Sequence, residues 1–341
     1  MNQRKALIVG ISGQDGGYLS KLLVAKGYEV HGTSRDSDVN PFESLKALGV
    51  YNDVILHSMS LIDFRSVMQV IMETQPDEIY NLAGQSSVAL SFAQPVETLE
   101  SLSFGTLNIL EVIRFNKLLV RFYNASSSEC FGSDTRGHVN ERSPFYPRSP
   151  YAIAKSTAHW LTAQYRDAYN IFALSGILFN HDSPLRPLRF VTRKISLAAA
   201  EICAGKAEKL VLGNLDSKRD WGYAPEYVEG MWRMVQVDEP EDFVLATGEA
   251  HTVREFADLA FKELDLELEW VGDGINEKGV CKRSGKVCVE VDERYYRPTE
   301  IGLLIGDTSK ARVKLGWEPK TRFQDLVKLM VRADYKKIMG K

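Results

Sequence analysis

The chain has 341 residues, 44% of them hydrophobic and 10% aromatic, so it can bury a large core in one large domain or two modest ones. Its 42 Lys and Arg nearly balance 45 Asp and Glu, which gives a formal net charge of -3 at pH 7. This balance provides no basic field for nucleic acid or for an anionic membrane, so we expect neither as a partner. Small molecules are the expected ligands.

The apolar run at residues 6–10 is far too short for a signal sequence, and no uncharged apolar stretch approaches the roughly 18 residues of a membrane span. We therefore expect a soluble, cytoplasmic protein. The four cysteines lie far apart and form neither a C-x-x-C pair nor a cluster with histidine. This spacing predicts reduced thiols and no metal site.

The first half of the chain alternates short β-branched runs with longer helical stretches. The predicted strands are residues 6–10, 29–35, 54–57, 78–83, 121–126 and 173–178. The predicted helices are residues 17–26, 62–73, 95–115 and 150–169, and Ser149 and Pro150 are a suitable N-cap and first residue for the last of them. This alternation predicts an α/β fold over residues 1–180, with a doubly wound parallel sheet of the Rossmann type.

The alternation is lost after residue 180. A proline-containing loop leads to a predicted helix at residues 191–204, and further helical segments are predicted at 308–315 and 322–333. We interpret residues 181–341 mostly as a smaller substrate-binding domain, with some later segments returning to the first domain.

A glycine-rich turn follows the first predicted strand directly. Gly10, Gly13 and Gly16 form a G-x-x-G-x-x-G run that opens a helix. Glycine permits a tight turn and lets the backbone approach a pyrophosphate, and the N–H groups of a helix N-terminus favour an anion. Because the run lies between a strand and a helix at the start of a βαβ series, it predicts dinucleotide binding.

The end of the second predicted strand distinguishes NAD from NADP in such folds. An acidic residue there accepts hydrogen bonds from the ribose hydroxyls, whereas an arginine pairs with a 2′-phosphate. This strand ends in Ser34, Arg35 and Asp36. Ser34 and Arg35 favour NADP, and Asp36 would repel the phosphate if it pointed inward. We predict NADP, with NAD as the alternative.

Two pairs of residues suggest proton-transfer chemistry. Tyr151 and Lys155 lie four residues apart on one helical face, and the lysine charge is expected to lower the pKa of the tyrosine. Phenolate can then take a hydroxyl proton while hydride leaves the same carbon for a nicotinamide. Ser127 and Glu129 follow the fifth predicted strand, where strand ends meet cofactor and substrate. The hydroxyl can bridge tyrosine and substrate, and the carboxylate can remove a proton that a neighbouring ketone has acidified.

Seven passages of the sequence resemble the GDP-mannose 4,6-dehydratases, a family of extended short-chain dehydrogenases, across nearly the whole chain. They are residues 10–16, 80–86, 126–132, 149–155, 176–184 with 190–194, 219–222, and 296–300 with 315–319. The first four are typical of the broader superfamily, and the later three are more selective. The resemblance implies a lyase that converts a GDP-hexose to the 4-keto-6-deoxy sugar by internal hydride transfer through NADP. GDP-mannose is the substrate that the resemblance favours.

The resemblance also implies roles for individual residues. The catalytic residues would be Ser127, Glu129, Tyr151 and Lys155. The cofactor contacts would be Gly10, Gly13, Gln14, Asp15, Gly16, Arg35, Leu82, Gln85, Ser86, Tyr151, Lys155, His181 and Arg186. The GDP-sugar contacts would be Ser87, Asn180, Lys194, Arg219, Arg297 and Glu300, where cationic groups suit a diphosphate and a carboxylate suits guanine N–H donors. A homodimer or homotetramer is implied, and the altered segment 36–40 favours the dimer.

Three other functions stay open. A sugar-nucleotide 4-epimerase or 4-ketose reductase needs Tyr151 and Lys155 but no acid at position 129, so Glu129 favours the dehydratase. A non-catalytic nucleotide sensor would need none of these groups. Ser60 and Ser87 depart from the family pattern, near the adenine and the sugar respectively, and leave open a dehydratase for another GDP-sugar such as a GDP-heptose.

Overall fold

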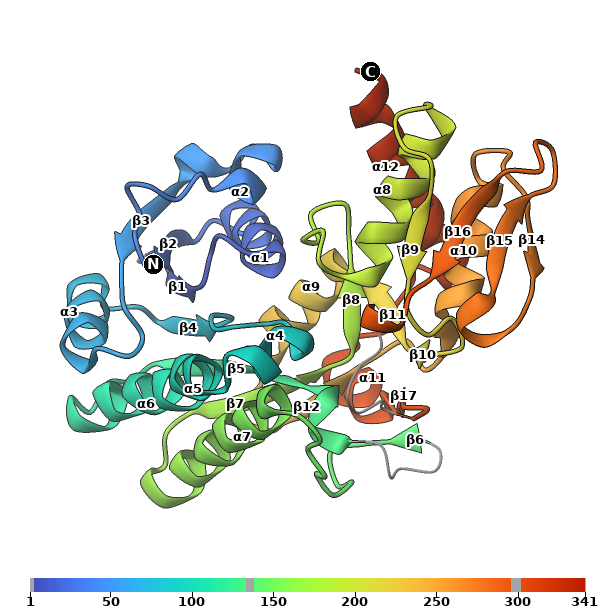
Figure 1. Cartoon of the computed structure of the whole chain (residues 1–341). Coiled ribbons are helices and arrows are strands. Elements are labelled where there is room, and N and C mark those ends of the chain that lie inside the picture. Colours follow the sequence, from blue (N-terminus) through green and yellow to red (C-terminus); the bar gives the residue numbers. More distant parts are fainter. Residues whose placement is uncertain (1–2, 133–137, 296–301, 341) are drawn as a thin grey trace.

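The computed structural model describes residues 3–132, 138–295 and 302–340. Within them, a seven-stranded parallel sheet forms the centre of the larger of two regions (Figure 1). In sheet order its strands are β12 (Phe243–Leu245), β7 (Ala173–Leu178), β5 (Arg121–Ser127), β4 (Glu78–Asn81), β1 (Lys5–Val9), β2 (Glu29–Ser34) and β3 (Val54–Ser58). The order reverses between β1 and β4, which confirms the predicted doubly wound sheet. Sheets of this kind bind their ligands beside the carboxyl ends of the strands at this point.

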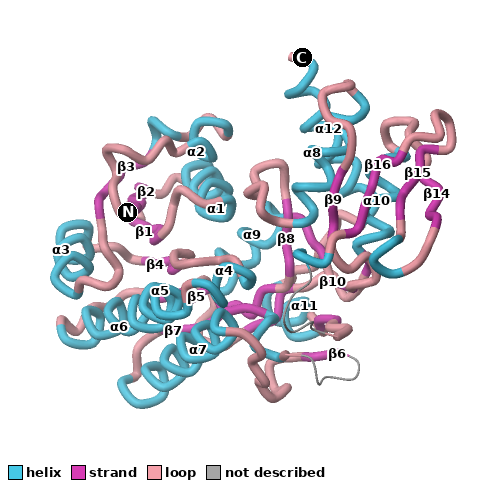
Figure 2. The backbone as a smooth tube through the Cα atoms, in the orientation of Figure 1, coloured by secondary structure: helices cyan, strands magenta, loops and turns pink. Residues whose placement is uncertain are grey.

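Helices cover both faces of this sheet (Figure 2). One face carries α1 (Gln14–Ala25), α2 (Glu43–Ala47) and α9 (Ala224–Met234), and the other carries α3 (Phe64–Thr74), α5 (Pro95–Leu99), α6 (Gly105–Phe115) and α7 (Pro150–Tyr169). Ile8 of β1 packs toward the first layer and Leu7 toward the second, as strand alternation requires. Both faces are therefore covered, and β2, β4, β5 and β7 are buried along almost their whole length.

Several predicted helices have different boundaries in the structure, and α12 (Phe323–Met339) extends past its predicted end at residue 333. Helix α1 begins three residues early because Gly16 lies inside its first turn, where a Cβ atom would come within 2.6 Å of Ile11. The predicted helix at 95–115 is divided into α5, a π-helical turn (Glu100–Phe104) and α6, and is preceded by α4 (Val88–Ala93). Ser87 caps α4 and Pro95 opens α5, so local signals explain the extra break.

The smaller region has its own sheet, in the order β14-β15-β16-β9, beside three helices. Its elements are β9 (Leu210–Leu212), β14 (Leu268–Val271), β15 (Lys278–Cys281), β16 (Val287–Val291), α8 (Val191–Cys203), α10 (Val253–Lys262) and α12 (Phe323–Met339). Helices α8 and α12 are joined by a buried ion pair between Arg193 and Asp334. Ser196 donates a second contact to Asp334 at 2.7 Å, so the buried carboxylate is well satisfied.

Later segments of the chain return to the large region. Strand β12 pairs with β7, helix α9 packs on α1, and α11 (Ser309–Leu315) packs against β12. Three two-stranded ribbons complete the fold: β8 (Asn180–Asp182) with β11 (Trp221–Tyr223), β10 (Lys218–Arg219) with β13 (His251–Thr252), and β6 (His138–Val139) with β17 (Ile305–Gly306). The remaining 3₁₀ turns are η1 (Tyr51–Asp53), η3 (Ser128–Phe131), η4 (Gly274–Asn276) and η5 (Glu293–Tyr295). The domain boundary at residue 180 stays a prediction.

None of the helices in the described ranges combines the length and the apolarity that crossing a bilayer demands. The four cysteines all lie among the described residues, and none of them forms a disulfide. They are Cys130, Cys203, Cys281 and Cys288. Cys281 and Cys288 lie at the two ends of the turn that joins β15 to β16.

Candidate active site

The glycine loop lies where the strand order reverses. Gly10 has a φ of +87°, and a Cβ atom there would come within 2.8 Å of Ala83 at the end of β4. Gly13 is the N-cap of α1, so no capping side chain occupies the N–H groups of the first turn. The loop therefore brings bare backbone and the N–H groups of a helix to one point, which fits the pyrophosphate of a dinucleotide.

The turn after β2 holds the carboxylate of Asp36 in local contacts. Its Oδ1 accepts the N–H groups of Asp38 and Val39 at 2.9 and 3.2 Å, while Ser34 donates its hydroxyl to the carbonyl of Asp36 at 2.6 Å. The neighbouring side chain of Arg35 is exposed. One carboxylate oxygen is thus committed to the turn, and the cation beside it is accessible.

Lys155 is held against the end of the central strand. Helix α7 carries it, and its Nζ donates to the carbonyl of Ala125 in β5 at 2.7 Å. Burial lowers the pKa of Lys155 to about 8. The same Nζ lies 5.9 Å from the centre of the Tyr151 ring, so the ammonium stands behind the tyrosine on one helical face, as the spacing predicted.

Ser127, Glu129 and Tyr151 come together at the carboxyl end of β5. The hydroxyl of Ser127 caps η3 by accepting the Glu129 N–H at 3.2 Å, and it also hydrogen-bonds to Tyr151. Burial raises the pKa of Tyr151, the hydrogen bond to Ser127 lowers it, and the charge of Glu129 raises it, with a net increase. The sequence predicted a lowered pKa for Tyr151, and this prediction is wrong because removal of the phenolate from water is the larger effect.

A hydrogen-bonded network joins the glycine loop to the ribbon that contains β8. His181 Nε2 lies 2.9 Å from Asp15 Oδ2, and its Nδ1 lies 2.7 Å from the carbonyl of Phe179. Gln14 donates to the carbonyl of His181 at 3.1 Å and accepts from Ser183 at 2.7 Å. Gln14 and Asp15 of the first turn of α1 are therefore bonded to His181 of the β8–β11 ribbon, and all three were predicted to contact the cofactor.

Three other predicted cofactor residues are held by contacts within the protein. Leu82 donates its N–H to Val9 at 3.0 Å, which keeps it beside the glycine loop. Gln85 donates to the carbonyl of Ser87 at 2.7 Å. Arg186 forms an ion pair with Asp182 at 3.0 Å.

The predicted GDP-sugar residues are spread over both regions. Ser87 caps α4, Asn180 pairs with Trp221 in the β8–β11 ribbon, and Arg219 Nη1 donates to the carbonyl of its neighbour Lys218 at 2.7 Å. Lys194 Nζ lies 3.7 Å from the centre of the Tyr295 ring. The predicted residues Arg297 and Glu300 lie outside the described residues.

Three residues near these groups were not singled out from the sequence. Arg189 donates to the hydroxyl of Ser86 at 2.9 Å and so spans from the β8–α8 loop to the loop after β4. Tyr295 packs under Lys194, and Ser183 bonds to Gln14. Ser183 and Tyr295 lie in or next to passages that carried the family resemblance, so those passages could have revealed them. Arg189 directly precedes the passage at residues 190–194, so that passage could have revealed it as well.

Comparison with solved structures gives the class of the fold. A UDP-glucose 4-epimerase from Thermotoga maritima superimposes with a TM-score of 0.81 and covers 99% of this chain and 100% of its own. At 21% identity, this likeness shows only the shared architecture. That architecture is the extended short-chain dehydrogenase fold predicted from the sequence.

Sequence comparison then gives the family. Residues 7–330 match the family model described as GDP-mannose 4,6 dehydratase. A GDP-mannose 4,6-dehydratase of Sinorhizobium fredii is 49% identical over 350 residues, which cover 100% of this chain and 99% of that protein. The human GDP-mannose 4,6 dehydratase is 48% identical and covers 96% of this chain and 91% of its own. The chain belongs to the GDP-mannose 4,6-dehydratase family, which confirms the predicted resemblance.

Proposed function

We propose that this protein converts GDP-mannose to the GDP-4-keto-6-deoxy sugar, with NADP as a cofactor that is regenerated in each turnover. The observation that carries this proposal is the position of Glu129, two residues after Ser127 and electrostatically coupled to Tyr151. Oxidation at C4 alone needs only a tyrosine and a lysine. A carboxylate at the same strand end adds the group that removal of water requires.

The residues divide the reaction into an oxidation and an elimination. Tyr151 takes the proton of the C4 hydroxyl while a hydride leaves C4, which produces a ketone. Glu129 removes the C5 proton that this ketone acidifies and delivers it to the C6 hydroxyl, which departs as water. Return of the hydride to C6 and of a proton to C5 completes the product. The sum is loss of one water from the sugar with no net oxidation.

The cofactor supplies a hydride acceptor and a positive ring when it is bound. Gly10, Gly13 and the N-terminus of α1 would hold its pyrophosphate. The hydrogen bond from Ser127 lowers the pKa of Tyr151 and so opposes the effect of burial. Lys155, whose Nζ lies 5.9 Å from the centre of the Tyr151 ring, would favour a phenolate while it is charged.

The turn after β2 supports NADP over NAD. Arg35 is exposed beside the end of the strand, and one oxygen of Asp36 is committed to the turn. We expect Arg35→Ala to weaken NADP binding by about tenfold and to leave NAD binding nearly unchanged, because arginine pairs with the 2′-phosphate. Equal weakening of both cofactors would argue against this selectivity.

The direct test is to incubate the protein with GDP-mannose and a trace of NADP and to follow the sugar nucleotide by mass spectrometry. We expect loss of one water in many-fold excess over the cofactor. A 4-epimerase would leave the mass unchanged, and a 4-ketose reductase would leave GDP-mannose intact. If GDP-mannose is inert but a GDP-heptose loses water, the dehydratase assignment stands with a different sugar. Inertness toward all GDP-sugars would favour a nucleotide sensor.

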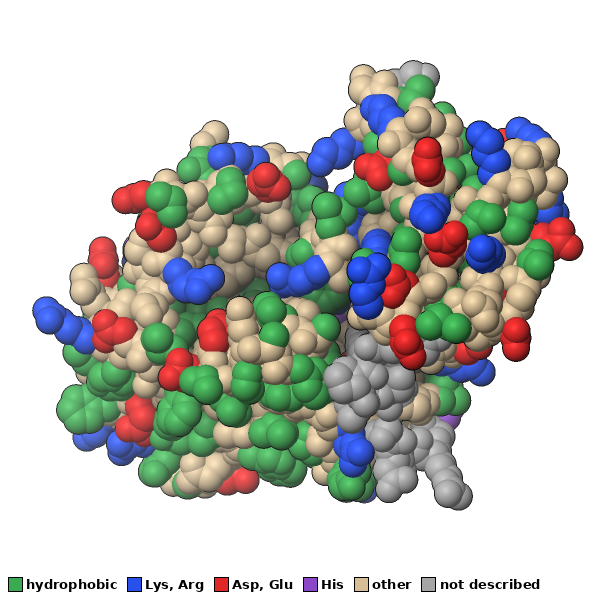
Figure 3. All heavy atoms as spheres, in the orientation of Figure 1, with side chains coloured by type: hydrophobic (Ala, Val, Ile, Leu, Met, Phe, Trp, Pro, Cys, Tyr) green, Lys and Arg blue, Asp and Glu red, His purple; other side chains and the backbone are tan. Residues whose placement is uncertain are grey.

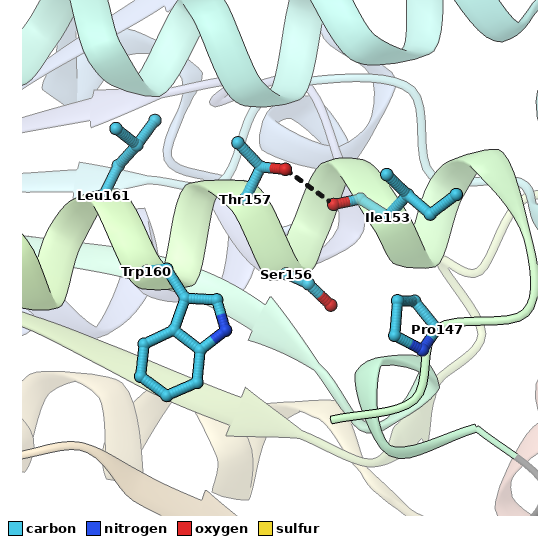
Figure 4. A pocket seen from close by; sticks show the side chains of 6 residues that line it. All are labelled: Pro147, Ile153, Ser156, Thr157, Trp160 and Leu161. Atoms are coloured by element: carbon cyan, nitrogen blue, oxygen red, sulfur yellow. Dashed lines mark hydrogen bonds between the residues drawn. The ribbon is translucent and has the colours of Figure 1, made fainter. Parts of the chain in front are cut away.

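We also propose that the protein acts as a cytoplasmic homodimer that associates through α5, α6 and α7. Apolar side chains gather on this face (Figure 3), and the exposed ones include Val96, Phe104, Phe115, Ile153 and Trp160. The side chains that line a groove of about 460 Å³ on α7 include Ile153 and Trp160 (Figure 4). An apolar surface of this kind, spread over neighbouring helices, suits burial against a second copy.

Light scattering tests the dimer. The wild-type protein should have twice the mass of one chain, and Trp160→Glu should shift it to the monomer. A wild-type monomer would overturn this part of the proposal. The four unbonded thiols are consistent with a reducing compartment.

A further inference from the structure

The hydrogen bonds of His181 define its charge. The partner of Nδ1 is the carbonyl of Phe179, which can only accept, so Nδ1 carries a proton. The partner of Nε2 is the carboxylate of Asp15, which also accepts when it is ionised. Both ring nitrogens are then donors, and the imidazole is a cation paired with the Asp15 anion.

The pair is shielded from water and held rigidly. His181 is 7% exposed, and the Asp15 side chain is 23% exposed. The ring of Tyr227 stacks on His181 with centroids 4.6 Å apart, and Gln14 donates to the other oxygen of Asp15 at 3.0 Å. Charges in such a position interact strongly, because little solvent screens them.

Asp15 occupies an unfavourable place for a protein that binds a pyrophosphate. It is the second residue of α1 and lies in the first turn, whose N–H groups point toward the glycine loop. A carboxylate there is favourable for the helix itself, but it repels a second anion that approaches the same N–H groups. A cation beside Asp15 cancels this repulsion.

We propose that His181 is a charge-compensating positioning residue, which neutralises Asp15 so that the N-terminus of α1 can accept the anionic pyrophosphate of the dinucleotide. The inference rests on the proposed binding of a dinucleotide at the glycine loop. It gives His181 a role through Asp15, because both of its ring nitrogens are bonded within the protein. It also links cofactor affinity to β8, where Asn180 lies directly before His181.

The proposal predicts a particular pH dependence. Burial lowers the pKa of His181, but the charge of Asp15 and its hydrogen bond outweigh burial and raise that pKa above its usual value. The cation is present below this raised pKa and is lost as the pH rises through it, which leaves Asp15 uncompensated. Cofactor affinity should therefore fall on the alkaline side.

Other groups near the pair must be separated from this effect. They are Tyr18 on α1, Tyr123 on β5, Lys155 on α7, Asp182 on β8, Arg186 in the following loop and Tyr227 on α9. The three tyrosines have a raised pKa and stay neutral between about pH 7 and 9. Lys155 does titrate in this range, so the test compares variants that all keep it.

The experiment is calorimetric titration of NADP into the full chain between about pH 7 and 9, above the second phosphate pKa of about 6. His181→Gln should weaken binding about tenfold at pH 7, as expected for one uncompensated charge near the ligand. The double variant Asp15→Asn with His181→Gln should recover affinity to within about threefold of the wild type, because no charge is left to compensate. His159→Gln, which removes another buried imidazole beside a carboxylate, Asp242, should bind like the wild type.

Asp15→Asn alone keeps a hydrogen bond to a neutral His181 and provides a second test should His181→Gln fail to fold. Whatever its affinity at pH 7, this variant should lose less affinity for NADP toward pH 9 than the wild type does, because it has no carboxylate that needs a cation. The proposal is overturned if the double variant binds NADP as weakly as His181→Gln does. It is also overturned if the NADP affinity of Asp15→Asn falls with rising pH as steeply as that of the wild type. A wild-type protein that binds no dinucleotide would overturn the proposed cofactor as well, which distinguishes the two failures.

Discussion

The catalytic edge, formed by Ser127, Glu129, Tyr151 and Lys155, and the nucleotide face, formed by Lys194 and Arg219, hold their polar groups in different ways. Lys155 is 8% exposed and bonds to the backbone of the central strand. Lys194 instead packs over Tyr295, which is 52% exposed. The large sheet thus fixes the groups that we propose transfer protons, whereas the groups that we propose bind GDP are half-buried side chains of the smaller region. Changes at the catalytic edge should affect kcat, and changes on the nucleotide face should affect KM.

The strongest challenge to this division is Tyr151→Phe. Because we assign removal of the C4 proton to the phenol of Tyr151, we expect kcat to fall by about 10³-fold with KM nearly unchanged. Steady-state assays with GDP-mannose measure both constants. Formation of reduced cofactor in a single turnover should also disappear, and its persistence would contradict the assigned role.

Glu129→Gln separates the two halves of the reaction. The amide cannot take the C5 proton, so water loss should slow by about 10²-fold while oxidation at C4 continues. Reduced cofactor should therefore accumulate in the absorbance of a single turnover. Dehydration at the wild-type rate would show that another group acts as the base.

Arg219→Ala tests the nucleotide face. Loss of one cation that pairs with the diphosphate should raise KM for the GDP-sugar by about tenfold and leave kcat within about twofold. The neighbouring variant Lys218→Ala is the matched control, and it should change neither constant. A fall in kcat at constant KM would break the proposed division between the two surfaces.

The smallest expected effect is a fall in kcat/KM for the sugar at alkaline pH. The pKa of Lys155 is about 8, and its ammonium is lost as the pH rises through that value. At saturating NADP, kcat/KM for the sugar should fall by about fourfold at half a unit above the pKa. Lys155→Arg keeps its charge at any accessible pH, so its residual activity should lack this fall.

Local signals predicted much of the fold. Ser149 and Pro150 define the start of α7, and the bounds of α7 and β7 agree with the prediction at both ends. Strand β12 was missed because three residues show no periodicity, and only pairing with β7 makes them part of the sheet. Helices α9 and α10 were missed for a related reason, since they lie among short segments that gave no regular alternation.

The site could be predicted where the spacing within a sequence motif already fixes the relative positions of its side chains. The spacing of Tyr151 and Lys155 places them on one helical face, and the structure agrees. The bond between Asp15 and His181 joins residues 166 positions apart, so tertiary packing alone creates it. The same holds for the raised pKa of Tyr151, which follows from burial that no local pattern reports.

The most direct test of the internal hydride cycle uses GDP-mannose with deuterium at C4 and a trace of unlabelled NADP. If the catalytic edge oxidises C4 and returns the same hydride, the product should have lost one water and should carry the deuterium at C6. Product without deuterium, or deuterium found in released reduced cofactor, would contradict a cycle in which the hydride stays in the site.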